Sequence, residues 1–142
     1  MTDDTKNGIS KWHWTFFAFQ SDLSGNIRRR YIEEWRSALS IKAQNEFEAI
    51  IEILSVAPIT SWRRPQFARL SGKRYAGMGE IRFKVDRDHY RVFGSFGPER
   101  LQFTLLHACK KQRSDLTAEM ELALQRKKLV ELDNRRIYAF TL

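Results

Sequence analysis

Apolar residues recur with the spacing of an α-helix in two neighbouring stretches of the first half of the chain. The first stretch starts at Ile27 and continues at Tyr31, Trp35 and Ala38, and the second contains Ala43, Phe47, Ile50 and Leu54. This periodicity predicts two amphipathic helices. Ser40 can cap the start of the second helix, and Pro58 ends it. Because the two helices lie so close in sequence, we expect a helical hairpin.

In the second half of the chain, apolar and polar residues alternate one by one instead. The alternating stretches are Ile81–Val85, Tyr90–Phe96 and Leu101–His107, and they are separated by turn residues at Asp86–Asp88 and at Gly97–Pro98. A period of two residues indicates strands that bury one face. Three such strands joined by tight turns predict an antiparallel meander.

The remaining segments complete the predicted order. The aromatic run Trp12–Phe19 suits a strand, residues 21–26 form a turn cluster, and residues 59–79 are rich in glycine and basic residues and indicate a loop. Asp115 can cap a last helix, whose common face holds Leu116, Met120, Ala123 and Leu124. The order β-α-α-β-β-β-α predicts an α+β fold. Its sheet is antiparallel or mixed, has about four strands, and packs with an N-terminal helical hairpin and a C-terminal helix.

The length of 142 residues is that of one domain, 1–142, in which we expect residues 1–11 to be a flexible extension. One cysteine excludes an internal disulfide and favours a reducing compartment. The sequence has neither a signal peptide nor an apolar run of about 20 residues. We therefore expect a cytoplasmic protein.

Positive charge is concentrated in one part of the chain. The net charge is +8, and residues 63–113 alone hold thirteen basic and four acidic side chains, a net +9. Surfaces without a charged partner mix both signs, so this block indicates a polyanionic partner. Residue alternation places Arg82 and Lys84 together on the polar face of their strand. His89, Tyr90 and Arg91 open the middle strand, and the last strand ends in His107, followed by Lys110, Lys111 and Arg113.

Metal-independent RNA cleavage needs residues of these types. A base takes the proton of the 2′-hydroxyl, an acid protonates the leaving oxygen, and cations stabilise the charge on the phosphorus oxygens. Histidine can transfer protons near neutral pH, and arginine matches the geometry of phosphate. We therefore expect one concave basic surface that contains a histidine and a tyrosine.

Structural explanations exist for the same residues. His107 at a strand end can be a hydrogen-bonded structural residue, His89 can be merely exposed, and Tyr90 faces the apolar side by parity. The basic loop with Lys73 and Arg74 can be solvated, and Cys109 can serve packing. No Cys/His pair has the spacing of zinc ligands, and no glycine-rich phosphate loop is present, so neither a metal nor another cofactor is expected.

Four motifs in succession resemble the RelE/ParE toxin superfamily, in particular its phage-derived HigB-like branch. These are Tyr75–Phe83 (YAGMGEIRF), His89–Phe93 (HYRVF), Leu105–Lys111 (LLHACKK) and the helical stretch Glu119–Ala123 (EMELA). The resemblance spans residues 14–134, and its motifs match from Gly79 onward. Cys109 stands where an aromatic residue is usual in these proteins.

The resemblance implies a toxin of a type II toxin–antitoxin pair that cuts mRNA at the ribosome, usually without metal. The family pattern carries catalysis over to Arg82, Arg91, His107, Lys110 and Lys111. Lys73, Arg74, Lys84, His89, Tyr90 and Arg113 are expected to bind RNA. The implied partners are the ribosome, mRNA and a helix-turn-helix antitoxin. A ParE-like toxin that binds gyrase without catalysis and an inactive RNA-binding relative stay open as alternatives.

Overall fold

The computed structural model describes residues 5–6, 9–10, 12–21 and 28–142 of the chain. Its helices are α1 (Tyr31–Ala38), α2 (Ile41–Ser55) and α3 (Thr117–Leu132), with short 3-10 turns η1 (Ile59–Ser61), η2 (Lys73–Tyr75) and η3 (Asn134–Arg136). Its strands are β1 (Thr5–Lys6), β2 (Ile9–Ser10), β3 (Thr15–Phe19), β4 (Phe67–Arg69), β5 (Met78–Val85), β6 (Asp88–Phe96), β7 (Gln102–Lys110) and β8 (Ile137–Ala139). None of the helices in these residues is long and apolar enough to span a bilayer.

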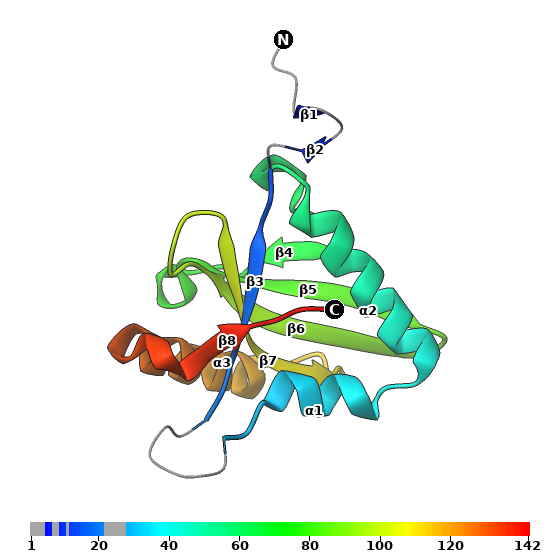
Figure 1. Cartoon of the computed structure of the whole chain (residues 1–142). Coiled ribbons are helices and arrows are strands. Elements are labelled where there is room, and N and C mark those ends of the chain that lie inside the picture. Colours follow the sequence, from blue (N-terminus) through cyan, green and yellow to red (C-terminus); the bar gives the residue numbers. More distant parts are fainter. Residues whose placement is uncertain (1–4, 7–8, 11, 22–27) are drawn as a thin grey trace.

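The main sheet has the strand order β4-β5-β6-β7-β3-β8, and β1 pairs with β2 apart from it (Figure 1). β3 runs parallel to β7, whereas every other neighbouring pair is antiparallel. The predicted α+β class and the β5–β6–β7 meander are therefore confirmed. The predicted number of about four strands was too low, because β4 lies in the segment expected to be a loop and β8 follows the last helix. These two strands of the main sheet are three residues long, too short to show a period.

The predicted ends agree with the structure at α2 but not at the starts of the other two helices, since the first helix was expected from Ile27 and α1 begins at Tyr31. Ser40 caps α2 by accepting a hydrogen bond from the Ala43 amide, and α2 ends at Ser55, ahead of Pro58. α3 begins one residue later than expected, with Leu116 at its N-cap position. Asp115 lies just before this position and accepts a hydrogen bond from the Thr117 amide. Most of the predicted turn cluster 21–26, Ile27, and residues 1–4, 7–8 and 11 of the expected extension lie outside the described residues.

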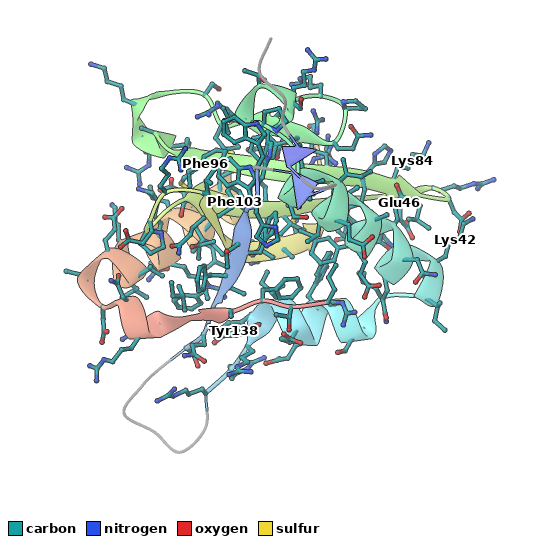
Figure 2. All side chains as sticks on the ribbon, turned by 45° about the horizontal axis from the view of Figure 1, so that its top comes forward. Lys42, Glu46, Lys84, Phe96, Phe103 and Tyr138 are labelled. Atoms are coloured by element: carbon teal, nitrogen blue, oxygen red, sulfur yellow. The ribbon has the colours of Figure 1, made fainter. Side chains whose placement is uncertain are left out.

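The two faces of the sheet are covered by different helices (Figure 1). On one face, α1 and α2 pack on a core rich in aromatic rings, in which Phe96 and Phe103 lie 5.0 Å apart between ring centres (Figure 2). On the other face, α3 places Ala123 and Leu124 against Met78 and other buried side chains of the sheet. The polar side chains of β5 share this second face with α3.

β7 contains one residue more than the strand it pairs with. Phe93 lies opposite His107 and Gly94 lies opposite Leu105, so Leu106 is an extra residue that forms a β-bulge. Leu105 belongs to the core under α1 and α2, whereas Leu106 belongs to the core under α3. His107 stacks on Phe93 and shares this second face. Strict alternation had placed His107 with Leu105, and the bulge corrects that expectation.

Gly94, which lies opposite Leu105 beside the bulge, has no room for a Cβ. A Cβ at this position would lie 2.5 Å from both the Phe103 ring and the Thr104 carbonyl oxygen. We expect Gly94→Ala to lower the free energy of unfolding by about 1–3 kcal/mol, the usual cost of overpacking. Urea denaturation measures it, with the exposed Ser114→Ala variant as the control. Equal stability of the Gly94→Ala variant and the parent would contradict the close packing described here.

Candidate functional site

Three strands place polar side chains in rows on the face that α3 only partly covers. The strand pairings give a row of Glu80, Phe93 and His107, a row of Arg82, Arg91 and Cys109, and an outer row of Lys84, His89 and Lys111. Lys111 joins the outer row because its amide donates to the carbonyl of His89. We call these nine residues the basic sheet face. It unites most of the predicted catalytic side chains.

A single carboxylate serves two arginines at the centre of this face. Glu80 Oε1 lies 3.5 Å from Arg82 Nε, and Glu80 Oε2 lies 3.9 Å from Arg91 Nε. The Arg91 side chain is only 5% exposed, and its Nη1 also donates to the Tyr90 carbonyl. Burial, together with the nearby Arg82, lowers the pKa of Arg91 from its ordinary value. Arg91 is thus a fixed charge behind the surface, whereas Arg82 reaches solvent.

His107 lies where the basic sheet face meets the start of α3. Its Nε2 contacts the carboxylate of Glu119, and Cys109 lies next to both groups. Burial lowers the pKa of His107, and the contact with Glu119 acts in the opposite direction. Burial, with a contribution from Glu119, raises the pKa of Cys109 to about 12. The imidazole and the thiol are therefore both uncharged near neutral pH.

The open half of the face is hollowed and lined by cations. Arg82 and Arg91 line adjoining hollows, one of them about 360 Å³ in volume, that extend toward the loop before β4 and the segment after β7. Their walls also contain Arg64, Arg69, Lys84, His89, Lys111 and Arg113. Lys84 shares one hollow with Glu46 of α2, and Figure 2 shows both side chains at the same end of the molecule. Such a surface can bind an extended polyanion.

Two residues predicted to belong to this surface lie on the opposite face of the sheet. Lys110 pairs with Tyr90 across the strands, and its Nζ lies 3.1 Å from Asp88. The Tyr90 ring stacks on Phe83 at 4.9 Å and joins the core under α1 and α2. The expectation of a tyrosine on the concave basic surface was therefore wrong. Without the bulge, Lys110 would lie on the basic side of the sheet. The extra residue moves it to the side of Tyr90.

The predicted RNA contacts Lys73 and Arg74 lie in η2, away from the hollows just described. The Arg74 Nε donates to Glu121 of α3 at 2.7 Å, and the Tyr75 hydroxyl donates to the same carboxylate at 2.7 Å. Glu121 holds η2 against α3 through these bonds. Arg74 is thereby engaged in a structural contact, while Lys73 is exposed beside it.

Sequence reasoning missed the acids that organise the site. Glu80 carries the right signal, since it shares its strand face with Arg82 by simple alternation. Glu119 gives no local signal, because only the tertiary packing of α3 brings it to His107. The spacing of zinc ligands is absent along the sequence, but the fold brings one ligand atom each of His107, Cys109 and Glu119 within 4.8 Å of one another.

The chain matches a protein-family profile. It is described as "Phage derived protein Gp49-like (DUF891)" and covers residues 34–128, more than half of the sequence. No curated protein and no solved structure gives a significant match. The matched range includes all nine residues of the basic sheet face and Glu119.

Removing the central carboxylate tests this electrostatic arrangement. We expect Glu80→Gln to lower the free energy of unfolding by about 1–3 kcal/mol, because the buried Arg91 guanidinium loses its counter-charge. Urea denaturation measures this loss, and Glu99→Gln, an exposed change of the same kind, is the control. A loss no greater than that of the control would show that Arg91 does not depend on Glu80.

Proposed function

The chain belongs to the Gp49-like family of phage-derived proteins, and from this premise we propose that it is a ribosome-dependent endoribonuclease that stops translation. Membership in this toxin-like family is consistent with a toxin of a toxin–antitoxin system, with an antitoxin as its partner. The finer assignment rests on the basic sheet face, where cations and a neutral imidazole share one open surface.

The observation that supports cleavage most strongly is that exposed cations and a buried, fixed cation line the same surface. Arg82 and Lys111 line the open hollow and can bind a phosphate from solvent. Arg91 lines the same hollow and adds a fixed charge, since its side chain is only 5% exposed. Preorganised charge of this kind stabilises a transition state because it needs no reorganisation when the charge on the phosphate develops.

His107 is the group we assign to proton transfer. Its ring is held between Phe93, which stacks on it, and Glu119, which contacts Nε2. With Nε2 donating to Glu119, the lone pair of the neutral ring lies on Nδ1, where it can accept the proton of a ribose 2′-hydroxyl. Glu119 is then a positioning residue, since it fixes the tautomer and the plane of the ring.

The remaining predicted residues take other roles in this proposal. Lys84, His89 and Arg113 line the hollows and bind flanking phosphates. Lys110 and Tyr90 face α1 and α2, so we assign them to folding and not to catalysis or base stacking. Lys73 and Arg74 are left to contacts outside the cleavage centre, because η2 is held on α3.

Induced expression tests the proposed activity. We expect the parent chain to stop incorporation of labelled methionine and to produce cleaved mRNA, and we expect Arg82→Ala or His107→Ala to restore translation. Each loss of a charge-stabilising or proton-transferring group corresponds to about a 100-fold or greater fall in cleavage rate. Arg135→Ala is the matched control, since Arg135 pairs with Asp133 in the η3 turn.

Two outcomes would overturn the endoribonuclease assignment. If growth stops while translation continues and gyrase-linked DNA breaks accumulate, the chain is a gyrase poison. If ribosomes bind the chain but mRNA stays intact in a purified translation system, the chain is an RNA-binding relative without catalysis.

Salt dependence tests the phosphate contacts separately from cleavage. Binding of a 2′-O-methyl RNA should weaken with salt at a log–log slope of about −0.7 for each phosphate contacted. Lys111→Ala should make this slope less steep by about 0.7, the share of one contact. Lys127→Ala should leave it unchanged, because Lys127 pairs with Glu131 on α3 and does not line these hollows. An unchanged slope for Lys111→Ala would remove Lys111 from the RNA surface.

A further inference from the structure

We propose that His107, Cys109 and Glu119 form a binding site for one Zn²⁺ ion. One ligand atom from each residue, an imidazole nitrogen, the thiol sulfur and a carboxylate oxygen, lies within 4.8 Å of the other two. Ligands bound at about 2.0–2.3 Å in a tetrahedral zinc site lie roughly 3.3–3.8 Å from one another. Small side-chain rotations therefore suffice to enclose an ion.

The backbone supplies two of the three ligands on a rigid element. His107 and Cys109 are two residues apart on β7, beyond the bulge, and so project to the same face. Glu119 lies in the first turn of α3, which packs on that face. A strand and a helix that are fixed by a common core hold ligands more accurately than a loop does.

The chemistry of this set selects among the divalent metals. A thiolate excludes Mg²⁺ and Ca²⁺, which prefer oxygen ligands, and the mixture of nitrogen, sulfur and oxygen suits Zn²⁺. Three protein ligands leave the fourth tetrahedral position to water, as in zinc sites that are not purely structural. Binding forms a Zn–S bond and breaks the S–H bond of Cys109, and the thiol proton goes to solvent.

The cluster is open to an ion from solvent, since all three proposed ligands are partly exposed.

This site goes beyond the proposed function but shares His107 with it. An imidazole nitrogen bound to Zn²⁺ cannot accept a proton from RNA. If the chain is an endoribonuclease, its zinc-loaded form should therefore be inactive, and a chelator should restore cleavage. Metal binding itself is measured without RNA, so failure of the zinc site and failure of the endoribonuclease proposal are distinguishable.

Titration calorimetry of the full chain with ZnCl₂, free of affinity tags, tests the proposal. We expect one Zn²⁺ per chain and release of one thiol proton, detected as a dependence of the heat on the buffer. Loss of a group outside the coordination sphere weakens metal binding by at most about 100-fold. Cys109→Ser and Glu119→Gln remove ligands, so each should weaken binding by more than that. His13→Gln is the control, because His13 is an exposed histidine outside the cluster.

Substitution with Co²⁺ identifies the ligand directly. A thiolate bound to Co²⁺ gives a charge-transfer absorption in the near ultraviolet, which should appear in the parent and vanish in Cys109→Ser. The far-ultraviolet circular dichroism of each variant checks that it folds, and Glu119→Gln provides a second variant if Cys109→Ser does not. Absence of binding to the parent, or equal binding by the parent and two folded ligand variants, would overturn the site.

Discussion

One extra residue in β7 determines which face of the sheet His107 and the later side chains of that strand occupy. Up to Leu105 the strand alternates regularly between the two cores, and Leu106 then shifts the register opposite Phe93 and Gly94. Without this shift His107 would face α1 and α2, and Lys110 would take the side that Lys111 now occupies. Gly94 beside the bulge has no room for a Cβ, because the Phe103 ring and the Thr104 carbonyl oxygen fill that space. An aromatic ring of the core under α1 and α2 thus packs directly on the backbone at the bulge.

α3 imposes a second constraint by covering only part of that face. Its apolar side chains bury Met78, Phe93 and Leu106, and its first turn contributes Glu119 at the boundary. Glu121 lies two residues further along the same helix and holds η2 through Arg74 and Tyr75. Acidic residues of α3 therefore hold elements together, while the basic rows beyond its edge stay accessible. Along the strands the face changes from apolar, through mixed polar, to purely basic.

Periodicity in the sequence was sufficient for the elements that have enough residues to show it. α2 with its Ser40 cap and the β5–β6–β7 meander were predicted from spacing alone, as was the common face of Arg82 and Lys84. Spacing does not reveal β4 and β8, whose three residues form strands only because longer neighbours pair with them. Nor does spacing reveal a bulge. A single extra residue has no pattern of its own, yet it reverses the face of every later side chain in the strand. His107 was thus selected for its chemistry, although strict alternation from Leu105 would place it on the other face.

Net charge alone does not show which cations are available to a ligand. The block 63–113 has a net charge of +9, but several of its basic residues already have acidic partners within the fold: Arg74 with Glu121, Lys110 with Asp88, and Arg82 and Arg91 with Glu80. Within the described residues, Lys84, Lys111 and Arg113 form no ion pair, and all three line the hollows beside Arg82. A polyanion therefore meets unpaired charge first, at the outer row. The acids and the imidazole lie further in, where burial strengthens each interaction. This order favours binding at the rim and chemistry, or a metal ion, at the edge of α3.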